Sequence, residues 1–200
     1  MFAILPGFLV GLSLIVAIGA QNAFVIRQGL TRQHVFAVVA ICAIADAALI
    51  AFGISGLGAA IASLPWLLEG IRWFGVAYLT WFGIRSIRSA LKTQSMDAGA
   101  GQSANLKTVI LSVLGFTLLN PHVYLDTVIL VGSVANQFGE DKWFFGSGAM
   151  FASLVWFSSI GYGSRAASRW MTKPIFWKVL DFLIAGVMFS IALTLALYRF

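Results

Sequence analysis

The chain contains six long apolar stretches, and they constrain its fold more than any other feature. Each is long enough to cross the hydrocarbon core of a bilayer as a helix, which takes about 20 mostly apolar residues. The stretches are residues 4–26, 35–62, 66–91, 107–133, 143–163 and 179–198. They predict an all-α membrane protein with six transmembrane helices that lie in a lipid bilayer.

The composition favours lipid over water as the surroundings of these helices. Of the 200 residues, 60% are hydrophobic and 10% are charged, whereas soluble domains carry about 25% charged residues. A soluble fold of this size would expose much of the apolar excess. The net charge of +6 does not indicate a nucleic-acid partner, because the basic residues fall between apolar stretches, like charges beside phospholipid head groups.

The positions of lysine and arginine predict the orientation of the helices, because cytoplasmic loops carry an excess of these residues. Ten of the 13 fall in the odd-numbered loops: Arg27, Arg32, Arg85, Arg88, Lys92, Lys107, Arg165, Arg169, Lys173 and Lys178. The odd-numbered loops are therefore expected in the cytoplasm and both termini on the outer side. A five-span alternative exists, because only a short turn near Pro65 separates the second and third stretches, but it would scramble this asymmetry.

A polar linker divides the chain into two halves with three apolar stretches each. We expect a first three-helix repeat at residues 1–91, a cytoplasmic linker at 92–106 and a second repeat at 107–200. Because three is an odd number, the halves would have opposite orientations in the membrane. This is the inverted-repeat plan of many secondary transporters.

The first stretch of each half contains a site that weakens a helix. In the first half this site is Gly19-Ala20-Gln21-Asn22, and in the second it is Asn120-Pro121. A broken helix at membrane depth is tolerated only inside protein or beside a water-filled cavity. Paired interruptions therefore indicate a binding site between the halves. The alternative is that Pro121 merely kinks a packed helix.

Two aspartates lie within the apolar stretches. Asp46 is the only charged residue of the second stretch, and Asp126 follows Asn120 in the fourth. An aspartate near a helix centre costs about 2.5–3.5 kcal/mol on insertion scales, so it should face the protein interior. His122 would share a helix face with Asp126, as Tyr124 would with Asn120. The alternative is that the aspartates pair with cations such as Arg72 or His122 and only hold helices together.

Other polar residues have simpler explanations. His122 is of a type that exchanges protons near neutral pH, but a hydrogen-bonded structural histidine is the alternative. Asp181 is expected to cap the last helix or to form a salt bridge. Cys42, the single cysteine, is expected to serve packing. Glycines at 7, 11, 53, 56 and 58 would let helices approach closely.

No enzyme signature is visible. The sequence has no Walker loop and no Gly-x-Ser-x-Gly elbow. Its two histidines, His34 and His122, are too few and too far apart for a metal cluster. We therefore expect neither an enzyme, nor a cofactor, nor a bound metal.

The motifs at the breaks resemble those of the lysine/arginine exporter family. Gly19-Ala20-Gln21-Asn22-Ala23-Phe24-Val25 resembles the family's first-helix signature, as Cys42-Ala43-Ile44-Ala45-Asp46-Ala47 resembles a motif of the second helix. The strongest match is Leu119-Asn120-Pro121-His122-Val123-Tyr124-Leu125-Asp126-Thr127, which looks most like the arginine-exporter branch. Related threonine/homoserine exporters have a Pro-Gly-Pro type of segment in place of Gly19-Ala20-Gln21.

The resemblance implies export of L-arginine or L-lysine from the cytosol across the inner membrane of a bacterium, without ATP. It carries over Asn22, Asp46, Asn120, Pro121 and Asp126 as candidate residues of the substrate and ion pathway. Gln21, His122 and Tyr124 are further candidates because they lie beside these positions.

Charge balance favours coupling to an ion. A net +1 substrate that leaves the cell moves against an inside-negative potential, at about 2.3 kcal/mol per 100 mV. Exchange for an incoming H⁺ or Na⁺ cancels that work. We expect proton antiport, with Asp46 as the carboxylate that alternates between proton and substrate.

Several alternatives stay open at this point. The cargo could be a neutral amino acid or a metal cation, since Asp46, Asp126, Asn22 and Asn120 offer oxygen ligands. The chain could instead be a membrane scaffold that transports nothing. The oligomeric state is open as well, a homo-oligomer included.

Overall fold

The structure is a computed structural model that describes residues 2–16, 19–57, 65–91, 105–168 and 174–197. The described residues form helices and no strand, which confirms the predicted all-α class. The long helices are α1 (Ile4–Ile15), α2 (Ala20–Thr31), α3 (Val35–Phe52), α5 (Pro65–Leu91), α6 (Leu106–Leu118), α9 (Lys142–Ala167) and α10 (Pro174–Leu197). The shorter ones are η1 (Gly53–Leu57), α7 (Pro121–Val123), η2 (Tyr124–Val131), α8 (Gly132–Asn136) and η3 (Gly139–Asp141).

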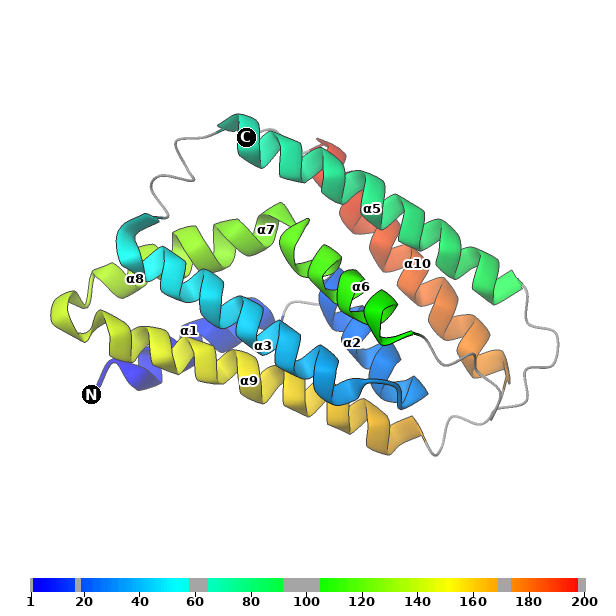
Figure 1. The fold of residues 1–200 in the computed structure, drawn as a ribbon, viewed down its shortest axis with the longest axis horizontal. Helices are drawn as coiled ribbons and strands as arrows, with labels where there is room; N and C mark the ends of the chain where they lie inside the picture. Colours follow the sequence, from blue (N-terminus) through cyan, green and yellow to red (C-terminus); the bar gives the residue numbers. More distant parts are fainter. Residues whose placement is uncertain (1, 17–18, 58–64, 92–104, 169–173, 198–200) are drawn as a thin grey trace.

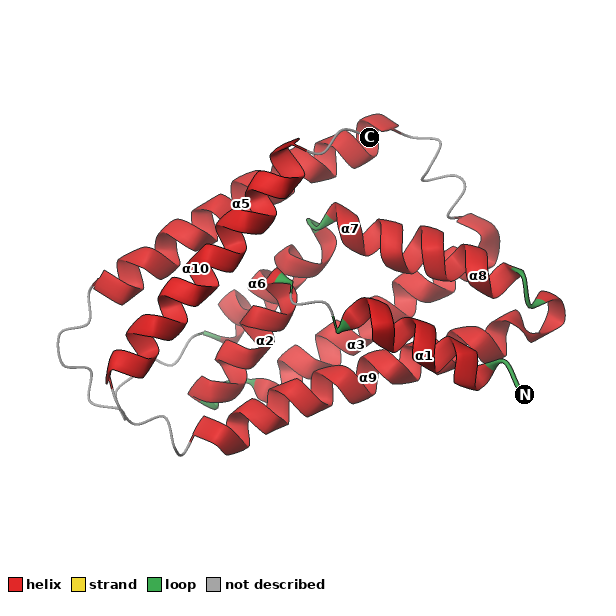
Figure 2. Cartoon of the chain, turned by 180° about the vertical axis from the view of Figure 1, so that it is seen from behind, coloured by secondary structure: helices red, strands yellow, loops and turns green. Residues whose placement is uncertain are grey.

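The helices form two packed groups. α5 and α10 lie along each other in opposite directions at one side of the molecule, while α1 and α3 pack along α9 at the other side (Figures 1 and 2). α2 and α6 lie between these groups, where the rings of Phe24, Phe82 and Phe116 pack edge-to-face or tilted, with centroids 4.8–6.0 Å apart. Cys42 is fully buried in the same core, as its expected packing role requires.

Three described helices are long and apolar enough to cross a membrane. They run over Val35–Gly56, Gly139–Ala167 and Ile175–Leu197, and the bent pair α1 and α2 can form a fourth span. α5 has 27 residues, but charged side chains such as Glu69 and Arg72 lower its hydropathy. The six-span arrangement as a whole therefore stays a prediction.

The first apolar stretch of each half is interrupted. α1 and α2 meet at an angle of 84°, so the predicted span 4–26 is two helices, and α2 continues past its predicted end to Thr31. In the second half, α6 ends at Leu118 and α7 begins at Pro121. The two predicted weak sites therefore coincide with the two breaks.

Other predicted boundaries moved because helices extend beyond the apolar residues. Hydropathy predicts a loop position for Arg27, but the residue lies inside α2. Its Nη2 lies 3.1 Å from Oδ1 of Asp181 in α10. Of the two roles expected for Asp181, the salt bridge is therefore the one that forms. The cap is wrong, because α10 already begins at Pro174. Most of the predicted linker, residues 92–104, lies outside the described residues.

Glycine allows α1 to lie directly on α9. A Cβ added to Gly7 would be 1.9 Å from the carbonyl oxygen of Phe145, and one added to Gly11 would be 2.8 Å from Cα of Ala149. Both distances are too short for any side chain. These two glycines thus make the close approach predicted for them.

The glycines after α3 differ among themselves. A Cβ on Gly53 would be 2.4 Å from the carbonyl oxygen of Val128, so it too permits a close helix contact. A Cβ added to Gly56 would meet no described atom within 4 Å, and the residue adopts a left-handed φ of +89°. Its role is conformational, because other residues rarely adopt that φ. Gly58 lies outside the described residues.

Candidate binding cavity

A cavity of about 310 Å³ lies where the two broken helices face α3 and α9. Its polar lining includes six of the eight candidate residues: Gln21, Asn22, Asp46, Asn120, His122 and Asp126. Tyr124 is not among the lining residues, and the side chain of Pro121 lies outside the part of the chain that the structure describes. The cavity also meets Thr127, Ser153 and Phe157. The structure thus brings both intramembrane aspartates to one cavity, together with three side-chain amides.

The side chain of Asn22 links α2 to the end of α1 across the first break. Its Nδ2 donates to the carbonyl oxygen of Ile15, at the end of α1, over 3.0 Å. Its Oδ1 accepts a hydrogen bond of 3.3 Å from Nε1 of Trp156 in α9. Asn22 thereby satisfies a backbone group that the break leaves without a helical partner.

Asp46 is held between α3 and α9. Its side chain is almost fully buried, with the residue 3% exposed, and its Oδ2 accepts a hydrogen bond of 2.8 Å from Oγ of Ser153. Arg72, considered above as a partner, instead binds Glu69 within α5. Among the described residues, Asp46 therefore has a hydroxyl donor and no cationic partner, so it can still attract a cation.

The second break is capped by its own side chains. Oδ1 of Asn120 accepts from the backbone N of His122 over 3.1 Å. The hydroxyl of Tyr124 donates to the carbonyl oxygen of Leu118 at the end of α6, over 2.9 Å. Pro121 stands at the first helical position, where its missing N–H costs no hydrogen bond. Tyr124 therefore shapes the break and does not line the cavity.

Asp126 lies in a π-helical segment. η2 covers Tyr124–Val131, and π-helical turns are frequent at functional sites because they displace side chains from regular helical positions. Asp126 also interacts electrostatically with His122. The pairing that the sequence raised as an alternative therefore applies to Asp126 and not to Asp46.

No pattern in the sequence indicated that α9 contributes to the cavity. Ser153 and Phe157 belong to an apolar stretch, where an isolated serine or phenylalanine is ordinary. Ser153 reaches Asp46 only because α9 packs on α3. Within the described parts of the chain, no three histidine, cysteine, aspartate or glutamate residues cluster in a way that could hold a metal ion.

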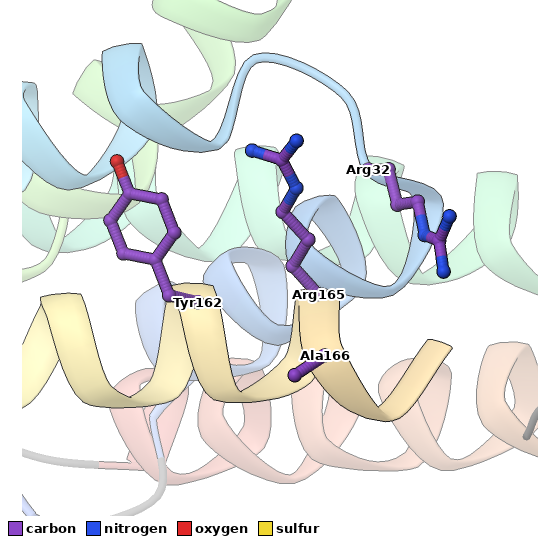
Figure 3. A pocket seen from close by; sticks show the side chains of 4 residues that line it. All are labelled: Arg32, Tyr162, Arg165 and Ala166. Atoms are coloured by element: carbon purple, nitrogen blue, oxygen red, sulfur yellow. The ribbon is translucent and has the colours of Figure 1, made fainter. Parts of the chain in front are cut away.

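A second cavity, of about 320 Å³, lies at the ends of α2 and α9. It is lined by Arg32, Tyr162, Arg165 and Ala166, and the side chains of Tyr162 and Arg165 project from the same face of α9 (Figure 3). Arg32 donates from Nε to Oγ of Ser168 over 2.6 Å. With two guanidinium groups and no carboxylate in its lining, this cavity would repel a cation.

Apolar helices around a buried polar cavity, with two broken helices facing it, define a membrane protein of the transporter class. Residues 12–199 match the model of the family described as LysE type translocator. This chain belongs to the LysE type translocator family. Membership of this family makes the chain a transporter and not an enzyme, as the sequence predicted.

Curated relatives cover nearly the whole chain. YggA of Aeromonas salmonicida is 43% identical over 194 residues, which cover 96% of this chain and 94% of the relative. The arginine exporter protein ArgO of Pectobacterium carotovorum is 38% identical and covers 98% of both chains. The lysine exporter LysE of Corynebacterium diphtheriae is 36% identical over 92% of this chain and 94% of its own. No solved structure matches this chain.

Proposed function

We propose that this protein is a secondary transporter that exports L-arginine, L-lysine or both from the bacterial cytosol across the inner membrane. The observation that carries the proposal is the cavity that Asp46 and Asp126 share between the two broken helices. Its volume of about 310 Å³ is at the lower end of the range of small-molecule sites, about 300–1,000 Å³. It can therefore take one amino acid.

The charges of the cavity suit a cationic substrate. A guanidinium or ammonium group in a membrane needs a counter-ion, and Asp46 offers a buried carboxylate without a cationic partner among the described residues. Asp126 adds a second carboxylate to the lining. The relatives named lysine exporter and arginine exporter support the same substrate class.

We further propose proton antiport, with Asp46 as the exchanging carboxylate. When Asp46 binds a proton, the substrate loses its counter-ion and leaves, and when it releases the proton, it can bind substrate again. Exchange of a net +1 substrate for one H⁺ moves no net charge, so the membrane potential does not oppose export. Na⁺ is the alternative coupling ion.

The proposed membrane arrangement is six spans in two inverted repeats, at residues 1–91 and 107–200, with the odd-numbered loops in the cytoplasm. The helix contacts support it, because they correspond when the halves are exchanged. α1 packs on α9 as α6 packs on α3, and α2 contacts α10 as α7 contacts α5. The pairs α3 with α9 and α5 with α10 correspond to themselves.

Counterflow of labelled L-arginine in proteoliposomes tests the proposal, with unlabelled L-lysine and L-threonine as competitors. Uptake that lysine inhibits and threonine does not would support a carrier of basic amino acids. Inhibition by threonine would assign a neutral cargo instead. If folded protein shows no counterflow of any amino acid, the function proposed here is wrong, and the metal-cation and scaffold alternatives come next.

A further inference from the structure

We infer that Gln21 and the first turn of α2 form a subsite for the α-carboxylate of the transported amino acid. This inference rests on the proposed function, since it requires an amino acid in the cavity. The cavity would then have one wall that binds an anion, in addition to the carboxylates of Asp46 and Asp126, which bind the cationic part of the substrate.

Gln21 is a buried donor that lacks an acceptor. The residue is 8% exposed and lines the cavity. Its Nε2 has no hydrogen-bond partner among the described residues. The thiol of Cys42 lies beside the amide, but sulfur is a weak acceptor. A buried amide donor without a strong acceptor is unfavourable, which favours an acceptor supplied by a ligand.

The N-terminus of α2, beside Gln21, likewise has no side chain that accepts hydrogen bonds from its first N–H groups. α2 has 12 residues, and its N-cap is Gly19, in an extended conformation and without a side chain that could cap the helix. The first hydrogen bond inside the helix runs from the N of Ala23 to the carbonyl oxygen of Gly19. The N–H groups before Ala23 therefore precede the helical ladder, where the positive end of the helix dipole attracts a carboxylate.

The second break does not offer an equivalent site. There the side chain of Asn120 already accepts a hydrogen bond from the N of His122, so the terminus has an acceptor of its own. Asp126 also follows that break and would repel an anion. The two halves, although built alike, thus present opposite chemistry: an anion subsite at the start of α2, and at the second break a capped start of α7 followed by Asp126 in η2.

Competition between L-arginine and L-argininamide tests the subsite, because the amide keeps the cationic side chain and replaces the carboxylate by a neutral group. The measurement is inhibition of labelled L-arginine counterflow by each compound. Gln21→Leu keeps a similar volume and removes the donor, whereas Gln21→Glu keeps the shape and adds a charge that repels a carboxylate. Gln28→Leu is the matched control, since Gln28 lies in the same helix and is 8% exposed but does not line the cavity.

We expect the wild type to prefer L-arginine over L-argininamide by about tenfold or more, the factor that one hydrogen bond to a charged group supplies. Gln21→Leu should remove most of this preference, and Gln21→Glu should reverse it, while Gln28→Leu should keep it. A folded Gln21→Leu variant with the wild-type preference would overturn the subsite and leave the proposed function standing. If the wild type carries a neutral amino acid instead, the same ratio is measured with that amino acid and its amide. If it carries no amino acid, both the function and the subsite are wrong.

Discussion

The hydroxyl of Ser153 in α9 donates a hydrogen bond of 2.8 Å to Oδ2 of Asp46 in α3, and both residues line the same cavity. This contact fixes one oxygen of the carboxylate and leaves the other available to a ligand or a proton. It also joins α3 and α9. The chemistry proposed for Asp46 therefore depends on the packing of these two helices.

Replacement of Asp46 by asparagine should abolish net efflux of arginine while the protein still inserts and folds. Asparagine has nearly the same shape and can still accept from Ser153, but it carries no charge for the substrate and cannot exchange a proton. The measurement is arginine efflux from preloaded proteoliposomes under an imposed pH gradient. Glu140→Gln is the control, because Glu140 is an exposed carboxylate in η3. Normal efflux by Asp46→Asn would remove Asp46 from the mechanism.

Ser153→Ala should lower the transport rate about tenfold, because a hydrogen bond to a charged group contributes about 1.5–3 kcal/mol. The control is Ser159→Ala in the same helix, since the Ser159 hydroxyl is exposed and donates to the Val155 carbonyl within α9. We expect that control to transport normally in the counterflow assay. Equal rates for both variants would show that Ser153 does not position Asp46.

Gly7→Ala should destabilise the protein by about 1–3 kcal/mol, the usual cost of overpacking. The added methyl group would meet the backbone of Phe145, which cannot move without shifting α9 against α1. Gly163→Ala is the matched control, because nothing lies within 4 Å of the added Cβ. Thermal unfolding of the purified variants in detergent measures the difference, and a Gly7→Ala protein as stable as the control would contradict the close α1–α9 contact.

The salt bridge between Arg27 and Asp181 should couple α2 to α10. With side-chain exposures of 26% and 10%, the pair is mostly buried, so we expect a coupling energy of about 0.5–3 kcal/mol. A double-mutant cycle of Arg27→Met and Asp181→Asn in thermal unfolding measures it. Additive effects of the two substitutions would mean that the pair contributes nothing beyond its separate parts.

The excess of lysine and arginine in the odd-numbered loops predicts that the C-terminus lies outside the cytoplasm. Alkaline phosphatase folds only outside, so a fusion at the C-terminus should be active, and a fusion within the segment 92–106 should be inactive. The reverse pattern of phosphatase activity would invert the proposed topology. A tag at the N-terminus that lies on the same side as the segment 92–106 would instead support the five-span alternative, in which two spans and not three separate them.

Much of the fold followed from local sequence properties. Asn120-Pro121 predicted a break because proline restricts the backbone at its own position, whatever surrounds it. Gly19-Ala20-Gln21-Asn22 did so because glycine has a low helix propensity and two amide side chains follow it in an otherwise apolar stretch. The prediction failed at helix ends, as at Arg27 and Asp181, because hydropathy marks where a helix is apolar and not where it stops.

Local sequence patterns alone predict an all-α membrane protein with a weak point in each half and two aspartates in apolar surroundings. These are properties of single segments, fixed by backbone chemistry and by the cost of charge in lipid. Only the tertiary structure decided that both aspartates share a cavity. It also decided that Ser153 serves Asp46 and that Gln21 lacks a partner among the described residues. Such relations join residues more than 100 positions apart in one case, and helix packing, which sets them, leaves no local pattern in the sequence.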